Sequence, residues 1–404
     1  MVKSFRRRGG GSRRRVLIIV QNLPVPLDRR VWLESCALRD AGFQVSVVCP
    51  KAPGDPSFQE LEGIRIRKYD PPPPTSGALS YAWEFAYCWV RALGLVLRAA
   101  SREGFDVIQA CNPPDTYWAL AALFKPFGKR FVFDQHDLCP EVYVSRFPNG
   151  SRVVRRALML FERATYALAD HVVATNESYQ ETAIGRGNVP AHRVTVVRTG
   201  PDPERLRKGT PVASWRHGRR YLCAYLGVMG PQDGVDLALR AAAAIVRSGR
   251  DDVHFVFIGT GDSYDELVML ADDLGISDRV TFTGRAPDET VFEVFSTADV
   301  GLSPYPLNPL NDVSTMNKTM EYMAFGLPVV AFDLKETRVS AQDAAVYVQP
   351  NDTDAYADAI TELLADPDRR AAMGRAGRQR VEQVLAWGHQ APRYIGVYEG
   401  LTST

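Results

Sequence analysis

The chain has 404 residues, of which 46% are hydrophobic and 24% are charged, and its formal net charge is +1. These values are typical of a globular protein and exclude a nucleic-acid binder that depends on a strongly basic surface. The length exceeds what a single hydrophobic core serves, so we expect two domains. No uncharged apolar run approaches the roughly 18 residues of a membrane-spanning helix.

Positive charge is concentrated in residues 1–15, which hold seven basic residues and no acidic one. Because this segment also contains three consecutive glycines, we predict a disordered basic tail. Two roles for the tail stay open: peripheral contact with anionic lipids, or solubilisation. The apolar residues 16–20 are too few for a secretory signal and predict a first strand.

The cysteines show no C-x-x-C pair and no histidine at metal-ligand spacing. We interpret them as reduced thiols of a cytoplasmic protein, with the inner face of the membrane as an open alternative location. They are Cys36, Cys49, Cys88, Cys111, Cys139 and Cys223.

Apolar runs typical of strands alternate with helical patterns through most of the chain. The first set of strands is predicted at residues 15–20, 45–49, 107–110, 130–133, 171–174 and 194–197. The second set is predicted at residues 221–226, 253–258, 280–283, 299–303 and 328–332. Between the first two strands we predict a helix from Arg29 to Asp40, ended by Gly42.

This repeated alternation predicts an α/β protein with two doubly wound, Rossmann-like domains that face each other across a cleft. We place the N-terminal domain at residues 16–204 and the C-terminal domain at residues 205–385, with a linker at 202–212. A last helix in residues 386–404 is free to pack on either domain. Ligands of such folds bind beyond the C-terminal ends of the strands, which predicts a site in the cleft.

An insertion interrupts the alternation after the rigid loop at residues 71–74. Five aromatic residues follow within nine positions: Tyr81, Trp83, Phe85, Tyr87 and Trp89. On a helix they would cover most of the circumference, which a water-facing helix does not tolerate. We favour a core helix over an interfacial or acceptor-docking helix.

Residues 311–338 are the most informative segment, because a polar loop runs into a short predicted helix that carries Lys318 and Glu321. The amide groups at such a helix start suit an anion. Lys318 and Glu321 are three positions apart and share one face, so together they suit a phosphate and a sugar hydroxyl. An ordinary surface salt pair is the alternative.

Four segments together resemble the family 4 glycosyltransferases of the two-domain GT-B fold, most closely the branch that assembles bacterial O-antigen and exopolysaccharide. The segments are residues 22–42, 134–141, 227–234 and 318–338. The resemblance implies a hexosyltransferase-type enzyme. It would move a sugar from a nucleotide sugar to an acceptor hydroxyl with retention, and it would need no metal or other cofactor.

The resemblance also assigns roles to individual residues. It implies catalytic roles for His136, Lys318 and Glu321. It places donor binding at Gly227, Gly230, Gly259, Gly261, Arg285, Asp312, Thr315, Asn317, Lys318 and Glu321. It places acceptor binding at Asp28, Arg29, Arg30 and Asp137. For Arg30, pairing with an acidic residue at the domain edge is the alternative, and for His136 it is capping of the next helix.

The chain departs from the family pattern at three positions. The first glutamate of the E-x7-E motif is replaced by Val313, and we expect Asp312 to substitute for it. An arginine and a lysine of the phosphate loop are replaced by Val228 and Asp233. We therefore expect Lys318, the amides near Gly230, and the helix start at 315–318 to hold the diphosphate, with Arg285 or Arg338 as the next candidates.

Two D-x-D strings, at residues 352–354 and 366–368, stand where helices begin, and we interpret them as caps rather than metal ligands. A nicotinamide-linked oxidoreductase is discounted, because residues 21–26 lack the G-x-G-x-x-G fingerprint. A sugar-nucleotide epimerase and a non-catalytic scaffold stay open. UDP is the nucleotide we expect, and a glycan or lipid-linked sugar is the acceptor. No nucleic-acid partner is expected.

Overall fold

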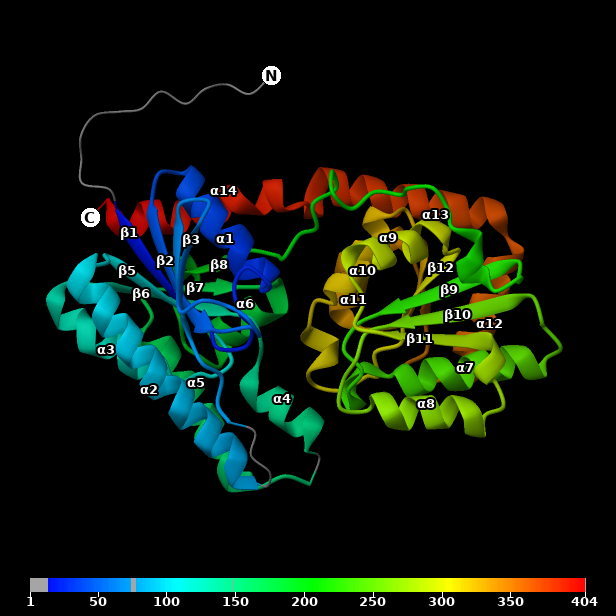
Figure 1. Ribbon diagram of the computed structural model, residues 1–404, viewed down its shortest axis with the longest axis horizontal. Helices are drawn as coiled ribbons and strands as arrows, with labels where there is room; N and C mark the ends of the chain where they lie inside the picture. Colours follow the sequence, from blue (N-terminus) through cyan, green and yellow to red (C-terminus); the bar gives the residue numbers. More distant parts are fainter. Residues whose placement is uncertain (1–13, 74–77, 148, 404) are drawn as a thin grey trace, which may run out of the picture.

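The computed structural model describes residues 14–73, 78–147 and 149–403. The chain forms two α/β domains, each built on its own sheet (Figure 1). Most of the predicted basic tail and the end of the predicted proline loop lie outside the described residues. Among the helices that the structure describes, none combines the length and the apolar character that crossing a membrane requires.

The first sheet has eight strands in the order β3-β4-β2-β1-β5-β6-β7-β8, and only β3 is antiparallel to its neighbour. Its strands are β1 Arg15–Ile19, β2 Gln44–Pro50, β3 Phe58–Leu61, β4 Ile64–Tyr69, β5 Val107–Cys111, β6 Arg130–Gln135, β7 His171–Ala174 and β8 Val194–Val196. Alternate residues of β1 enter opposite cores: Val16 and Ile18 pack on one face, and Leu17 and Ile19 on the other. A sheet covered by helices on both faces follows from this pattern.

The helices of this half are α1 Arg29–Asp40, α2 Ala78–Arg102, α3 Trp118–Phe124, α4 Cys139–Arg146, α5 Arg152–Leu168 and α6 Glu177–Gly185. α1 begins where the carboxylate of Asp28 accepts a hydrogen bond from the amide of Val31 at 3.1 Å. It ends before Gly42, whose φ of +93° favours glycine. α1 packs on one face of the sheet, while α2 and α5 cover the other.

The second sheet has six parallel strands in the order β11-β10-β9-β12-β13-β14. They are β9 Tyr221–Leu226, β10 Val253–Ile258, β11 Val280–Gly284, β12 Val300–Ser303, β13 Val329–Phe332 and β14 Ala345–Val348. The helices are α7 Val235–Arg247, α8 Tyr264–Asp273, α9 Asp288–Thr297, α10 Asn317–Ala324, α11 Lys335–Ala341, α12 Thr353–Ala365 and α13 Pro367–Arg380. α7, α8 and α12 pack in the core on one face of this sheet, and α9 and α10 pack in the core on the other face.

The chain returns to the first domain at its end. α14 Trp387–Thr402 packs against α1, and its Tyr394 and Tyr398 are buried in the first domain's core (Figure 1). The outgoing and returning segments cross at Gly200, where an added Cβ would lie 1.9 Å from the carbonyl oxygen of Leu385. A glycine is therefore required at this crossing.

The two doubly wound domains confirm the predicted fold class, and each predicted strand has a counterpart. β3, β4 and β14 were not predicted. The preference for a core helix is wrong for the first turns of α2, because Trp83 is 52% exposed and Phe85 is 39% exposed. Tyr87 and Trp89 are partly buried against the core, and the side chain of Tyr81 lies outside the described residues.

Candidate active site

A cavity of about 1500 Å³ lies between the two domains, at the segments that follow β1, β2, β6, β7, β8, β11 and β12. It brings together nine of the predicted site residues: Asp28, Arg29, Arg30, His136, Asp137, Arg285, Thr315, Asn317 and Glu321. The other predicted residues do not line it: Gly227, Gly230, Gly259, Gly261, Asp312 and Lys318. The cavity therefore unites residues that are far apart in sequence and come from both domains.

The wall from the first domain is built on a buried cluster of charges. The guanidinium of Arg30 donates to Asp134 at 2.8 Å and lies 3.0 Å from the carboxylate of Glu34. It also donates to the carbonyl of Val197 at 2.9 Å. Arg30 is 6% exposed, and its charge is paired with carboxylates inside the domain. This agrees with the ion-pair alternative for Arg30.

His136 completes this cluster, because its Nε2 lies 2.6 Å from Asp134. Burial lowers the pKa of His136, but the charge of Asp134 and the hydrogen bond to it outweigh burial and raise the pKa overall. Burial would raise the pKa of Asp134, but Arg30 and His136 hold it below its usual range. Because the His136 side chain contacts Asp134 and α4 has no side-chain cap, the capping alternative for His136 is wrong.

Asn112 positions the loop that carries His136. Its side-chain oxygen accepts from the amides of His136 at 2.6 Å and Asp137 at 3.2 Å, and its amide group donates to the carbonyl of Asp137. Asparagine offers both a donor and acceptors, which this double role requires. Asn112 was not among the predicted site residues, since an asparagine before two prolines is typical of an ordinary turn.

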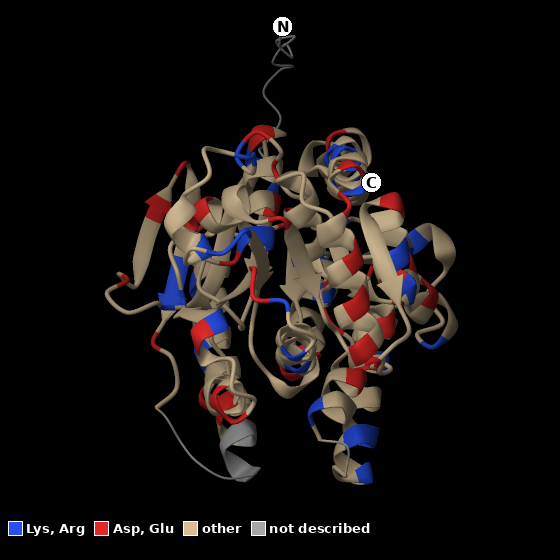
Figure 2. Cartoon of the chain, turned by 90° about the vertical axis from the view of Figure 1, so that its right-hand side faces the viewer, with Lys and Arg blue, Asp and Glu red and all other residues tan. Residues whose placement is uncertain are grey.

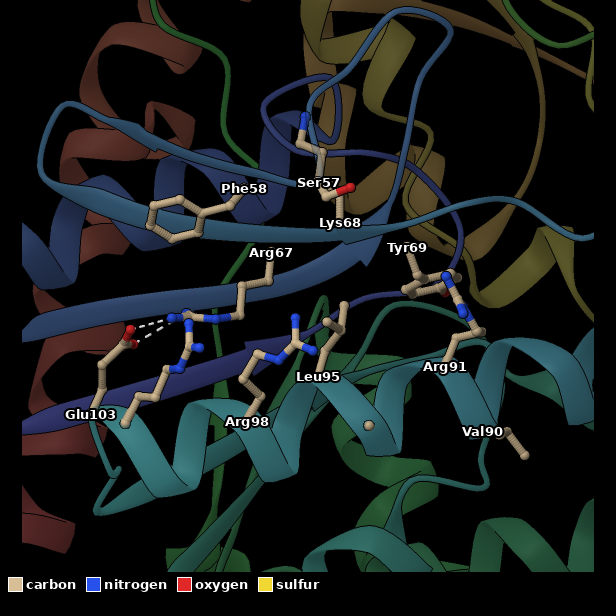
Figure 3. A pocket seen from close by; sticks show the side chains of 12 residues that line it. Ser57, Phe58, Arg67, Lys68, Tyr69, Val90, Arg91, Leu95, Arg98 and Glu103 are labelled. Carbon is tan, nitrogen blue, oxygen red and sulfur yellow. Dashed lines mark hydrogen bonds and ion pairs between the residues drawn. The ribbon is translucent and has the colours of Figure 1, made fainter.

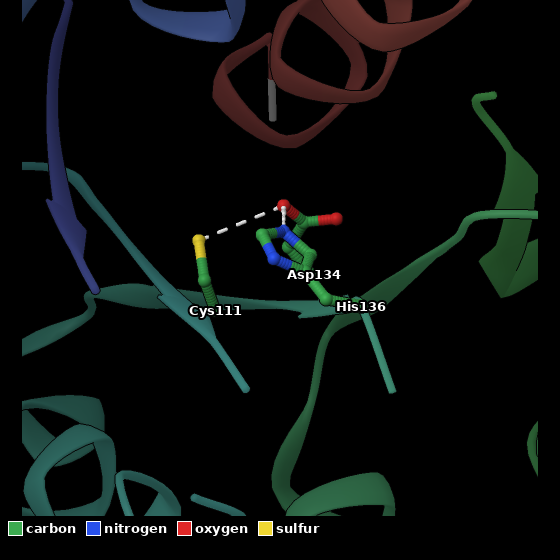
Figure 4. A group of neighbouring side chains, drawn as sticks. All are labelled: Cys111, Asp134 and His136. Atoms are coloured by element: carbon green, nitrogen blue, oxygen red, sulfur yellow. Dashed lines mark hydrogen bonds and ion pairs between the residues drawn. The ribbon is translucent and has the colours of Figure 1, made fainter. Parts of the chain in front are cut away.

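Cys111 lies beside the same carboxylate, with its Sγ 3.6 Å from Asp134 (Figure 4). Cys111, Asp134 and His136 form a cluster of possible metal ligands that sequence spacing did not reveal. Arg30 and His136 already occupy the carboxylate, and burial raises the pKa of the Cys111 thiol well above its usual range. A protonated thiol is a poor ligand, so the cluster fits a hydrogen-bonded network better than a metal site.

In the second domain, Lys318 lies at the first turn of α10 and donates to the hydroxyl of Tyr305 at 2.7 Å. Its Nζ is 4.0 Å from the carboxylate of Asp233. That carboxylate also accepts a hydrogen bond from the amide of Gly230 at 3.0 Å. Contrary to our expectation, this amide is therefore not free to bind a diphosphate. Asp233 therefore shapes the loop and orients Lys318.

The glycines predicted for donor binding bring the loops after β9 and β10 together. An added Cβ at Gly259 would lie 1.8 Å from the carbonyl oxygen of Gly227, and one at Gly261 would lie 2.5 Å from that of Met229. At Gly227 itself, a Cβ would meet the amine of Lys318 at 2.6 Å. Gly259 and Gly261 therefore need glycine for the contact between the loops, and Gly227 lies beside the end of the Lys318 side chain.

Glu321 faces the first domain across the cleft. Its carboxylate accepts from Arg29 at 3.2 Å, and Arg29 also donates to Asp288 at 2.8 Å. Burial raises the pKa of Glu321, and the charges of Arg29 and Lys318 oppose that rise. Glu321, which we predicted to bind the nucleotide sugar, thus contacts Arg29, which we predicted to bind the acceptor substrate.

Further contacts between the domains involve Asn176 and Arg198, which were not among the predicted site residues. Asn176 donates to the carbonyl of Val313 at 2.9 Å and to the hydroxyl of Thr315 at 3.1 Å. Arg198 contacts Thr315 and the buried carboxylate of Glu336. No local pattern identifies these residues, because their partners lie more than a hundred positions away in sequence.

Asp312 and Arg338 have partners outside the cavity. Asp312 accepts from the amide of Lys335 at 2.9 Å, at the start of α11, and Arg338 pairs with Asp333. The two D-x-D strings are confirmed as caps. Asp352 accepts from the amide of Ala355 and Asp366 from that of Arg369, each at 2.9 Å.

Two family descriptions match the chain, one in each domain. "Glycosyl transferase 4-like domain" matches residues 28–200, and "Glycosyl transferases group 1" matches residues 220–366. A D-inositol 3-phosphate glycosyltransferase from Thermomonospora curvata is 30% identical over 298 residues, which cover 69% of this chain and 68% of the relative. The chain belongs to the family 4 glycosyltransferases of the GT-B fold.

Other relatives differ in how much of this chain and of their own length the similarity covers. A GDP-mannose-dependent alpha-(1-6)-phosphatidylinositol monomannoside mannosyltransferase from Mycobacterium tuberculosis is 30% identical over 57% of this chain and 62% of its own length. With some curated relatives the match spans only about half of their length. The solved sucrose-phosphate synthase from Thermosynechococcus elongatus has a TM-score of 0.78 and 21% identity, covering 97% of this chain and 100% of that one, which shows the GT-B fold.

Proposed function

We propose that this chain is a retaining glycosyltransferase that moves a hexosyl group from a nucleotide sugar to a hydroxyl of a glycan or a lipid-linked acceptor. The cleft carries the proposal, because it joins His136 and Asp137 of one domain with Asn317 and Glu321 of the other. Its volume of about 1500 Å³ exceeds the roughly 300–1,000 Å³ of a single small-molecule pocket. Room for a donor and an acceptor together supports transfer between two substrates.

In this proposal the second domain holds the nucleotide diphosphate. Lys318, held by Tyr305, supplies positive charge to the leaving phosphate, and the carboxylate of Glu321 accepts hydrogen bonds from the ribose hydroxyls. Arg29 leaves Glu321 when the ribose binds, since both need the same carboxylate oxygens. The leaving phosphate then accepts the proton of the acceptor hydroxyl, and the new bond forms on the face from which the diphosphate departs.

The first domain orients the sugar and the acceptor. Asp134 holds the ring of His136 and favours its charged form, which suits stabilisation of a departing anion. Asp137 lines the cleft beside it and is available to an acceptor hydroxyl. With protein cations in these places, we propose that the reaction needs no metal.

The identity of the donor and acceptor is the finer part of the proposal. We retain UDP as the expected base, although the mannosyltransferase relative is named for GDP-mannose. The assembly of a bacterial polysaccharide near the inner face of the membrane is the setting we propose, with residues 1–15 in peripheral contact with anionic lipids. The exposed Trp83 and Phe85 on α2 favour a surface that meets an amphiphilic acceptor.

The test is a thermal-shift series with UDP, GDP, ADP and TDP and their common sugars, followed by a transfer assay. A ligand at about 100 times its Kd stabilises by roughly 2.7 kcal/mol, which raises the unfolding midpoint visibly. We expect one nucleotide to raise the midpoint of the wild type and not that of Glu321→Ala. Nucleotide binding without any product would instead favour a scaffold, and an altered sugar without acceptor would favour an epimerase.

The stereochemistry and the metal dependence need separate measurements. The anomeric configuration of the product, read by NMR, distinguishes retention from inversion. We expect activity to persist with EDTA present, and a loss restored by Mg²⁺ or Mn²⁺ would contradict the metal-independent mechanism.

A further inference from the structure

A buried glutamine connects the last helix of the chain to the charged cluster beside His136. Gln109 lies on β5, whose other residues are apolar or cysteine, and it pairs in register with Val132 of β6. Its side chain is fully buried and does not line the cavity between the domains. A buried amide needs partners for both of its ends, so its contacts show what it holds in place.

The amide nitrogen of Gln109 donates to two carboxylates. It lies 2.8 Å from Oε2 of Glu34 and 3.2 Å from Oδ2 of Asp134. The same oxygen of Asp134 is 2.6 Å from Nε2 of His136. The amide of Gln109 and the ring of His136 therefore share one carboxylate oxygen, and a change at either reaches the other.

The amide oxygen of Gln109 accepts hydrogen bonds from α14. The hydroxyl of Tyr394 donates to it at 2.6 Å, and the hydroxyl of Tyr398 donates to it as well. The two tyrosines are four positions apart, share one face of the helix and are fully buried. Burial raises the pKa of both hydroxyls well above the usual range, so both keep their protons at neutral pH.

These contacts determine which way the amide of Gln109 points. One end of an amide only donates and the other only accepts, so two hydroxyl donors on one side and two carboxylates on the other favour a single orientation. Burial, with the charge of Asp134 adding to it, raises the pKa of Glu34 to about 8. Glu34 therefore carries a proton at neutral pH and can donate to an amide oxygen that turns toward it once the hydroxyls are removed.

We propose that Gln109 is a positioning residue for His136, held in its orientation by Tyr394 and Tyr398. Its amide hydrogen occupies the oxygen of Asp134 that His136 contacts, and so moderates the pull of that carboxylate on the ring. α14 follows the second domain in the chain and packs on the first, so the docking of the last helix tunes a group in the cleft. The inference rests on the proposed function only in taking His136 as a catalytic residue.

The proposal predicts the direction in which the pKa of His136 moves. Tyr394→Phe/Tyr398→Phe removes two hydroxyls and leaves every charged or titratable group that faces the ring: Asp28, Arg30, Glu34, Cys111, Asp134 and Asp137. An amide oxygen turned toward Asp134 makes the site more negative and raises the pKa of His136 further. General loosening has the opposite effect: burial lowers this pKa, the contact with Asp134 outweighs burial, and losing that contact lets the pKa fall.

The test is an NMR titration of the histidine rings in the full chain, in which the signal of His136 is identified by its absence from His136→Gln. We expect the midpoint of His136 in Tyr394→Phe/Tyr398→Phe to lie above that of wild type by about half a pH unit or more. Gln109→Met removes the amide itself and should move the midpoint in the same direction. Midpoints that are unchanged or lower in both variants would overturn the proposal.

Two control variants separate positioning from a general loss of stability. Tyr356→Phe removes a buried hydroxyl of the second domain, which donates to the carbonyl of Val330 at 2.7 Å. Glu103→Gln disrupts the pairing with Arg67 beside α2, at another part of the first sheet (Figure 3). Neither should move the midpoint of His136. A shift of the same size and direction in either control would overturn the proposal, because loosening alone would then explain it.

The pH dependence of kcat tests the consequence for transfer. Charged His136 supports the departing anion in the proposed reaction, so kcat should fall as pH rises through the pKa of His136. In Tyr394→Phe/Tyr398→Phe this fall should move to higher pH by as much as the NMR midpoint does. A midpoint that moves without the kcat profile would overturn the catalytic consequence. If the chain shows no transfer at all, the proposed function fails, and the NMR titration still decides the role of Gln109.

Discussion

The two walls of the cleft handle charge in different ways. In the first domain, Arg30, Glu34, Asp134 and His136 pair among themselves and are largely buried. In the second domain, Glu321 lines the cleft and Lys318 lies one turn away on α10. Both have partners that a ligand can replace: a tyrosine hydroxyl and a carboxylate at 4.0 Å for Lys318, and an arginine of the opposite domain for Glu321. Basic and acidic residues are interspersed along the ribbon in Figure 2, and the formal net charge is +1, so this contrast does not arise from a general excess of one sign.

The contrast teaches how the site divides its tasks. A buried cluster of charges that pair with one another fixes geometry before any ligand arrives, since each member is costly to move. Partly buried groups with replaceable partners respond to the ligand instead. The first wall is thus expected to govern stability and pH dependence, and the second to govern donor binding and turnover.

The largest expected effect comes from breaking the buried cluster. Asp134→Asn removes the carboxylate shared by Arg30 and His136, and losing one partner of a buried ion pair costs about 3–5 kcal/mol. Urea unfolding, followed by fluorescence, measures the change. Asp278→Asn, at an exposed carboxylate, should change the free energy of unfolding by less than about 1 kcal/mol. Similar costs for the two variants would show that the cluster does not stabilise the first domain.

The pH dependence of the same wall gives the next effect. Burial raises the pKa of Glu34 from 4.5 to about 8, with Asp134 adding to the rise and Arg30 opposing it. The folded chain therefore holds this proton more tightly than the unfolded chain. The stability that it adds is complete below about pH 4.5 and is lost as pH rises through about 8.

Glu34→Gln cannot titrate, so the unfolding free energy of wild type should fall relative to this variant between about pH 5 and pH 8. We expect a relative change on the order of 3 kcal/mol from these pKa values. Urea unfolding at both pH values measures it. A difference that is the same at both would mean that Glu34 is already ionised in the folded chain.

The second wall is tested through turnover. Lys318→Ala removes the cation proposed for the leaving phosphate, and kcat should fall at least about tenfold. Steady-state kinetics with saturating donor measures kcat. Lys335→Ala, which removes a surface lysine paired with Glu181, is the control and should leave kcat within about twofold. An unchanged kcat in Lys318→Ala would mean that another residue supplies the positive charge to the leaving phosphate, and Arg285 is the next candidate in the cleft.

The smallest effect concerns the contact between the two walls. If Arg29 must leave Glu321 before the ribose binds, Arg29→Ala should tighten nucleoside diphosphate binding by about two- to fivefold. Arg146→Ala breaks a different pair between the domains, with Asp262, and should leave the affinity unchanged. Calorimetric titration measures both. Weaker binding by Arg29→Ala would show that Arg29 contacts the nucleotide rather than competing with it.

Local patterns predicted much of the fold for reasons that are themselves local. The capped helix from Arg29 to Asp40 and the apolar runs of the buried parallel strands are determined by neighbouring residues. β3 and β4 escaped prediction because their polar and charged side chains lack a continuous apolar run. β14 escaped because it is a short, half-buried edge strand.

The sequence by itself determined which family the chain resembles, its two α/β domains, and the residue types that suit a phosphate and a sugar. Only the tertiary structure decided which of those groups are available. It showed that Arg30 pairs with Asp134 and that the amide of Gly230 donates to Asp233. It also showed that the side chain of Asn112 holds the loop of His136. The reason is physical: a side chain's chemistry is local, but its partners, burial and charge state depend on residues brought together from distant parts of the chain.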